Sequence, residues 1–170
     1  MDIPDGVVSI GDSAFYACST LENIKIPNSV TTIGVQAFAG CESLASVTLS
    51  NNLTSVERDM FSGCKSLNIV TIPDSVTKID CFVFYRCSNL ESVTISKGLA
   101  SIGKAFSECP KLTHIFCKPT DPPFVYNVDG IGIGSDNLGL KIYVPKQSVE
   151  AYKTSEDWSK YADIIEGCDF

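Results

Sequence analysis

Five cysteines recur at a regular interval along the chain. Cys18, Cys41, Cys64 and Cys87 are each 23 residues apart, and Cys109 follows after 22. Thiols in such a series suggest two chemistries, which are disulfide bonds between neighbours and a metal site. The interval lacks the paired CxxC spacing of zinc sites. If each interval formed one layer of a stacked structure, neighbouring cysteines would lie about 5 Å apart, which a disulfide can bridge.

Few other residues could take part in catalysis or metal binding. His114 is the only histidine, so a Ser-His-Asp triad or a multi-histidine metal site would have to be built around it. Its position between Leu112 and Ile115 instead predicts an ordinary outward side chain on a strand. The chain also has no recognisable nucleophile elbow. We therefore predict no enzymatic activity, with no catalytic residue, no metal and no cofactor.

A glycine-rich run, Gly130-Ile131-Gly132-Ile133-Gly134, superficially suggests a phosphate-binding loop. It follows a proline-rich segment and no helix is expected to open after it, so the context of a dinucleotide site or a P-loop is missing. Asp129 and Asp136 bracket the run and suggest a calcium ion as one alternative. Solvated loop carboxylates are the interpretation that we favour.

The cysteines belong to a longer repeating unit that must position them. A phenylalanine and a leucine keep the same spacing; the copies are Phe15/Leu21, Phe38/Leu44, Phe61/Leu67, Phe84/Leu90 and Phe106/Leu112. A fixed period of this length is typical of a solenoid, in which each repeat buries its apolar face against its neighbours. The cysteine series then falls in the core, and a buried free cysteine behaves as a small hydrophobic residue. We predict buried, unpaired thiols, with Cys117 in a strand core position and Cys81 and Cys168 more exposed.

Two short segments of each unit alternate polar and apolar residues. Leu21-x-x-Ile24-x-Ile26 predicts a strand with both isoleucines on one side, and a proline ends this strand in three copies. Val30-x-x-Ile33 predicts a short second strand. The glycine that follows it in three coils (Gly11, Gly34, Gly103) is expected to supply a positive φ. The Ala-Phe-x-x-Cys stretch is expected to form a helical turn that closes the coil.

These patterns predict an α/β repeat with two parts. Residues 1–117 form a solenoid of about five coils, the first one truncated, with short strands in parallel sheets and short helical turns. Residues 118–170 form a loop followed by a C-terminal cap. In this second part, 118–139 reads as a long loop, 140–144 as a strand, 147–153 as a short helix and 156–161 as a further helical turn. Val149, Tyr152, Trp158 and Tyr161 are expected to cover the last coil, because a solenoid end otherwise exposes strand edges and apolar surface.

Composition narrows the choice of partners. The formal net charge is −7 and no Lys/Arg cluster occurs, so nucleic acid is an unsuitable ligand. No apolar run reaches the roughly 18 residues of a membrane span, and no signal peptide is recognisable. The chain starts with the end of a strand, at Ile3-Pro4, so we expect a fragment of a longer protein. The bare edge at 3–10 could then pair with another molecule.

The repeat resembles the BspA-like group of bacterial leucine-rich repeats. The resemblance covers 3–117 and is carried by Ile26-Pro27-Asn28-Ser29-Val30-Thr31-Thr32-Ile33-Gly34 and by Ala37-Phe38-x-x-Cys41-x-x-Leu44. The tail, with Ile142-Tyr143-Val144-Pro145, is also similar to that group. The resemblance implies a bacterial protein outside the cell or on its surface, adhesion to host proteins or other cells, and no catalytic residues.

The outward positions of the first predicted strand are the best candidates for recognition, because the inner face of a curved solenoid is its usual binding surface. We call this surface the strand face. Ile69 and Phe116 are apolar where solvent is expected, which is typical of contact patches. The predicted ligand-binding residues are Lys25, Thr48, Ile69, Thr71, Thr94, His114 and Phe116. The predicted partner is a protein or glycan on a host or neighbouring cell. The alternative is a structural spacer of a larger cell-surface protein, with no ligand of its own.

The cysteine interpretation can be tested without a ligand. Titration of the denatured protein with a thiol reagent is expected to find all eight cysteines as free thiols, because the repeat places them by core packing rather than by pairing. A substantially lower number would mean that the chain forms disulfides.

Overall fold

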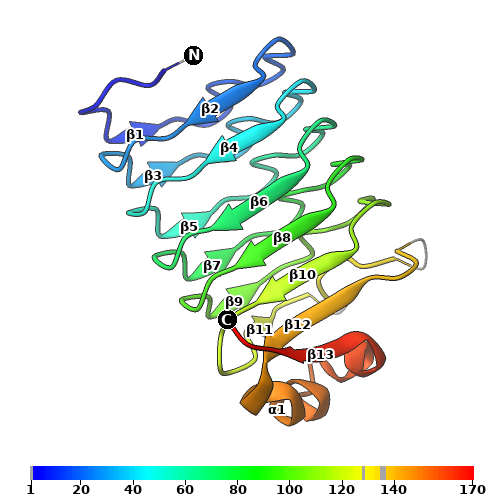
Figure 1. The fold of residues 1–170 in the computed structure, drawn as a ribbon. Coiled ribbons are helices and arrows are strands. Elements are labelled where there is room, and N and C mark those ends of the chain that lie inside the picture. The colour runs from blue at the N-terminus through cyan, green and yellow to red at the C-terminus, as the bar shows by residue number, and fades with distance from the viewer. Residues whose placement is uncertain (1, 128, 135–136) are drawn as a thin grey trace.

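The computed structural model describes residues 2–127, 129–134 and 137–170. Coils stack along one axis, from the N-terminal coil to a helical cap at the opposite end (Figure 1). The strand face consists of β2 (Asn23–Lys25), β4 (Ser46–Thr48), β6 (Ile69–Ile72), β8 (Ser92–Ile95), β10 (His114–Cys117), β12 (Lys141–Pro145) and β13 (Ile165–Cys168). The second side consists of β1 (Ser9–Ile10), β3 (Thr32–Ile33), β5 (Ser55–Val56), β7 (Lys78–Ile79), β9 (Ser101–Ile102) and β11 (Phe124–Val125).

Each strand pairs in parallel with the strand one coil away. Val70 of β6 lies beside Val93, then Ile115 and then Ile142, so one apolar residue per coil stands in a column. All four side chains are almost completely buried. The sheets are not continuous. On the strand face, β6, β8, β10, β12 and β13 form one sheet and β2 and β4 form another. On the second side, β5, β7, β9 and β11 form one sheet and β1 and β3 another. Both interruptions fall between the second coil (26–48) and the third (49–71).

A phenylalanine column fills the centre of the turn side. The rings of Phe15, Phe38, Phe61, Phe84 and Phe106 stack nearly parallel, with successive centroids 5.1, 5.6, 5.9 and 5.8 Å apart. Stacked rings of this kind add to the free energy gained by burying large apolar side chains. Their spacing follows the coil repeat, so the 23-residue period is expressed as a continuous aromatic core.

The cysteine column lies next to the phenylalanine column. The thiol of Cys64 donates to the carbonyl of Phe38 at 3.3 Å, and that of Cys87 to the carbonyl of Phe61 at 3.2 Å. Burial raises the pKa of Cys41 to about 11 and that of Cys109 to about 12. The prediction of burial holds for most of the column, but Cys18 is exposed because no coil covers it. Cys117 is buried as expected, and Cys81 and Cys168 are half-buried.

The turn that carries these columns differs from the expected helical turn. The Ala-Phe-x-x-Cys stretches form successive tight turns, because residues on either side of the phenylalanine have positive φ. In the fourth coil these are Phe82 (φ 60°) and Arg86 (φ 58°). The glycines predicted to supply positive φ do not have it. Gly34 is needed for close packing instead, since a Cβ there would lie 2.5 Å from the amide nitrogen of Asp12.

The chain continues the solenoid beyond residue 117, so the expectation of about five coils was too low. Part of the predicted loop 118–139 is strand β11, which pairs with β9. The strand face then gains β12 beside β10 and β13 beside β12. The expectation missed β13, and it missed β11 because a two-residue strand between prolines and glycines has almost no alternation to detect.

The cap consists of η1 (Lys146–Ser148), α1 (Val149–Thr154) and η2 (Ser159–Ile164). The expected helix at 147–153 lies within this region, and the second helical turn is three residues later than expected. The hydroxyl of Tyr152 donates to the carbonyl of Pro119 at 2.9 Å, and Nε1 of Trp158 donates to that of Pro123 at 2.7 Å. Both aromatic side chains are fully buried, so the cap closes the core and satisfies the carbonyls of the last coil.

The segment that carries β11 is fixed by a polar cluster. The hydroxyl of Tyr126 lies 3.1 Å from the carbonyl of Ile79 and 3.0 Å from Oδ1 of Asp80. Burial alone would raise the pKa of Asp80, but hydrogen bonds from Lys78, the Cys81 amide and Tyr126 hold it below the ordinary value. Asp80 is therefore an ionised anchor for the segment that carries β11.

Truncation of the phenylalanine column should reveal how strongly it holds the coils together. Phe61→Ala is expected to lower the free energy of unfolding by about 3–5 kcal/mol, because it opens a cavity in a fully buried column. Phe15→Ala is the matched control and should cost clearly less, since Phe15 is half-buried in the first coil. Urea unfolding followed by circular dichroism measures both. Equal losses would contradict a stabilisation that depends on burial between two coils.

Removal of the Tyr126 hydroxyl tests the polar anchor. Tyr126→Phe is expected to lower the free energy of unfolding by about 1–2 kcal/mol at pH 7, because a hydrogen bond to a charged carboxylate is lost. The folded pKa of Asp80 is depressed, so its contribution is complete above the unfolded value near about 4. That contribution is lost as the pH falls through the folded pKa. The difference between wild type and variant should therefore be smaller at pH 3 than at pH 7, as measured by urea unfolding.

Candidate binding face

The outward side chains of the strand face form two rows that run along the solenoid axis. From β6 to β12, one row consists of Ile69, Ser92, His114 and Lys141, and the other of Thr71, Thr94, Phe116 and Tyr143. On the first two coils the corresponding pairs are Asn23 with Ser46 and Lys25 with Thr48. The strands place these side chains outward because the alternate positions carry the buried apolar column.

All seven predicted binding residues lie on this face. Lys25, Thr48, Thr71 and His114 are exposed, Ile69 is 59% exposed, and Thr94 and Phe116 are half-buried. They do not converge on one pocket. With about 4.8 Å between neighbouring strands, Lys25 on β2 and Phe116 on β10 are about 19 Å apart. The predicted set is therefore an extended row, with Lys25 and Thr48 at one end and the aromatic residues at the other.

Tyr143 joins His114 and Phe116 in an aromatic cluster at the C-terminal end of this face. The ring centroids of Phe116 and Tyr143 are 5.1 Å apart, and His114 lies 6.0 Å from each of them. The planes are within 17° of parallel. Tyr143 was absent from the predicted set, although it occupies an outward position of the expected strand 140–144. The period breaks before that strand, so the sequence does not show which residue stands beside Phe116.

Polar groups surround the aromatic cluster. Nζ of Lys141 and a carboxylate oxygen of Glu166 form an ion pair at 2.6 Å, and the hydrogen bond raises the pKa of the lysine. Nδ1 of His114 lies 2.8 Å from the hydroxyl of Thr113. Half-buried rings beside exposed polar side chains are typical of recognition surfaces, since apolar contact supplies affinity and the polar rim supplies specificity.

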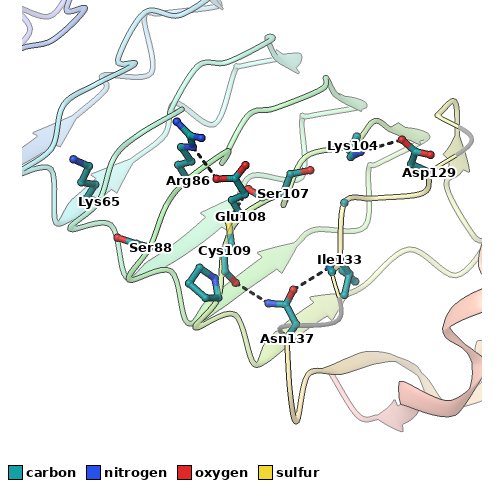
Figure 2. Close-up of a pocket in the computed structure, with 13 residues that line it drawn as sticks. Lys65, Arg86, Ser88, Lys104, Ser107, Glu108, Cys109, Asp129, Ile133 and Asn137 are labelled. Atoms are coloured by element: carbon teal, nitrogen blue, oxygen red, sulfur yellow. Dashed lines mark hydrogen bonds and ion pairs between the residues drawn. The ribbon is translucent and has the colours of Figure 1, made fainter.

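A cavity lies on the turn side, away from the strand face. It has a volume of about 820 Å³, and its charged lining residues come from neighbouring coils and from the 129–137 segment (Figure 2). Arg86 pairs with Glu108 at 2.8 Å and Lys104 with Asp129 at 3.0 Å. These charges neutralise one another in ion pairs. Among the described lining residues there is no histidine and no nucleophile hydrogen-bonded to a base, so this part of the cavity does not resemble a catalytic site.

The glycine-rich run forms one wall of this cavity and has a packing role. The amide of Phe106 donates to the carbonyl of Ile131 at 3.0 Å, so the run continues the turn side of the preceding coils. Gly132 lies tightly against Ser107, whose Oγ a Cβ would approach to 2.7 Å. Of the two aspartates considered for calcium, Asp129 pairs with Lys104, and Asp136 lies outside the described residues.

Within 2–127, 129–134 and 137–170, no group of three His, Cys, Asp or Glu side chains is placed to hold a metal ion. In the same ranges, no helix is both long and apolar enough to cross a bilayer.

Comparison with known structures shows the same architecture in bacterial proteins. A leucine-rich cell surface protein from Faecalibacterium prausnitzii A2-165 is 35% identical, with a TM-score of 0.66, over 68% of this chain and 31% of that chain. The pneumococcal vaccine antigen PcpA has a TM-score of 0.73 at 20% identity over 100% of this chain and 41% of that one. A leucine-rich repeat protein from Bacteroides ovatus has a TM-score of 0.61 at 24% identity over 84% and 48%.

This chain thus spans less than half the length of each of those three proteins. A search of curated proteins found no match. The family described as BspA type leucine rich repeat region matches residues 3–121, with six copies. Solenoids of this kind are in general non-enzymatic modules for binding or support. The chain belongs to the BspA-type leucine-rich repeat family.

Proposed function

We propose that this chain is a non-enzymatic binding module, displayed outside the cell, that adheres through its strand face to a protein or glycan on a host or neighbouring cell. The observation that carries the proposal is the aromatic cluster of His114, Phe116 and Tyr143 at one end of a face whose other outward side chains are mostly small and polar. The F. prausnitzii protein, which is described as a cell surface protein, supports the proposed location.

The distribution of side chains favours a binder over a spacer. A spacer has no reason to differ from coil to coil on its solvent side, whereas this face changes from Lys25 and Thr48 to a cluster of three rings. Ile69 is exposed two strands away from His114 in the same row. An exposed apolar residue near partly buried rings marks a localised contact patch.

A structural spacer remains the alternative function. It is favoured by the regular core and by the ladder of Thr48, Thr71 and Thr94, because threonine is simply a good strand residue and threonine pairs stabilise sheets. The two functions differ in whether the strand face has a ligand at all, so a binding experiment separates them.

The test measures binding of the protein to an array of extracellular-matrix proteins and glycans. The variants Phe116→Ala and Ile69→Lys are measured on the same array. The expected result is a hit that both variants weaken at least tenfold, because the loss of a hot-spot residue near the centre of an interface costs about 2 kcal/mol or more, and about 1.4 kcal/mol corresponds to tenfold. Val8→Lys is the matched control, since Val8 is 60% exposed but lies off the strand face.

Circular dichroism must show that each variant remains folded. A hit that the strand-face variants leave unchanged would place recognition elsewhere and contradict the proposal. No hit on the array would favour the spacer.

A further inference from the structure

Arg86 occupies a backbone position that the preceding coils give to small residues. Its φ of 58° lies in the left-handed region, as do the φ values of the equivalent residues Ala17, Gly40 and Gly63. The amides of all four bond to a carbonyl of the next coil. Glycine adopts this conformation freely, whereas a longer side chain is strained there. A strained position that carries a long charged side chain indicates a role for that side chain.

The guanidinium of Arg86 is oriented by two neighbours. It lies over the ring of Tyr85, 4.9 Å from the centroid. Its Nε donates to one carboxylate oxygen of Glu108 at 2.8 Å, while the Tyr85 hydroxyl donates to the other at 2.9 Å. The hydrogen bonds from Arg86 and Tyr85 hold the pKa of Glu108 below its ordinary value. A guanidinium held between a ring and a carboxylate is pre-organised, which lowers the cost of ordering it on a ligand.

The ion pair with Glu108 leaves most donors of Arg86 unused. Within 2–127, 129–134 and 137–170, Nε is the only guanidinium nitrogen of Arg86 with a hydrogen-bond acceptor. The two terminal nitrogens are directed away from Glu108 (Figure 2). The side chain of Arg86 is 61% exposed, so a ligand can reach it. The paired N–H groups of a guanidinium match the two oxygens of a carboxylate.

These donors stand at one end of the turn-side cavity, with Lys65 and Ser88 close by (Figure 2). Lys65 and Ser88 hold equivalent positions of neighbouring coils, so their Cα atoms are about 5 Å apart. The ammonium of Lys65 donates to Glu42 at 2.8 Å and has further N–H groups to offer. Pro110 and Ile133 add apolar surface to the lining. The cavity therefore combines unused donors with an apolar wall.

We propose that this end of the cavity binds the carboxylate of an acidic sugar, with the terminal nitrogens of Arg86 donating to its two oxygens. A carboxylate only accepts hydrogen bonds, so it suits a group of unused donors. The volume of about 820 Å³ lies in the range of small-ligand sites, and a single aspartate or glutamate side chain would leave most of it unfilled. A sugar ring also brings hydroxyl groups for Ser88 and Lys65 and an apolar face for Pro110 and Ile133.

The proposed sugar site is separate from the strand face. Arg86 lies on the turn between β7 and β8, whereas His114 and Phe116 belong to β10 and point outward on the strand face. The inference therefore goes beyond the proposed adhesion through the strand face, and either of the two can fail without the other.

Titration of the intact protein with D-glucuronate, followed by nuclear magnetic resonance, tests the site. D-Glucose is the matched control ligand, because it has the same ring with a hydroxymethyl group in place of the carboxylate. Glucuronate is expected to shift the Nε–Hε signal of Arg86 and the amide signal of Ser88, with a dissociation constant in the millimolar range. Glucose is expected to bind at least tenfold more weakly, because it cannot form the charge-assisted pair. Sodium chloride keeps the ionic strength equal in both titrations.

Three variants sharpen the test, with circular dichroism to show that each remains folded. Arg86→Gly installs the residue that two preceding coils have at this position and should weaken glucuronate binding at least tenfold. Arg86→Lys keeps the charge but loses the paired N–H groups and should weaken it at least threefold. Arg58→Ala is the matched control and should change nothing. Arg58 is also exposed and lies over a ring, that of Phe82, but it is not among the lining residues.

Four results would overturn the proposal. Equal affinities for glucuronate and glucose would show that the carboxylate is not recognised. Unchanged binding in Arg86→Gly would place the site elsewhere, and an equal loss in Arg58→Ala would mean non-specific attraction to surface cations. Binding of an aspartate-rich peptide without any shift on addition of glucuronate would assign the turn side to an acidic protein.

Discussion

The structure depends on the vertical register of its coils. No single coil of 22 or 23 residues can bury its own leucines, valines and phenylalanines, because each is one layer thick. The side chains become buried only when equivalent residues of successive coils stand above one another, as in the ring column from Phe15 to Phe106. The parallel ladders hold that register, and the thiol-to-carbonyl bonds of the cysteine column follow the same rule.

This constraint explains what the sequence could and could not predict. Residues such as Val70, Phe61 and Cys87 were assigned to the core from their period alone, and all are buried. The turns were harder, because positive φ at non-glycine residues such as Phe82 and Arg86 leaves no compositional trace. β11 and β13 were missed because the period has already ended there. The interruption between the second and third coils is also invisible in the sequence, since the spacing of 23 continues through it.

The candidate site could be predicted only in part, for related reasons. Outward positions follow from alternation, so Ile69, His114 and Phe116 could be placed on one face before the structure was known. The partner of Phe116 could not be identified, because Tyr143 follows it by 27 residues and not by 22 or 23. A regular repeat predicts its own continuation well, but gives little information about the segment that closes it. In this chain, that segment supplies the third ring of the cluster.

The cap has a consequence for how proteins of this kind vary in length. Tyr152 and Trp158 bind carbonyls of Pro119 and Pro123, and β12 and β13 extend the sheet from β10. All of these contacts involve the last coils only. Duplication or loss of a coil nearer the N-terminus would therefore leave every contact of the cap in place. Unequal recombination between repeats can lengthen or shorten such a stack in whole coils, while its C-terminal closure is inherited unchanged.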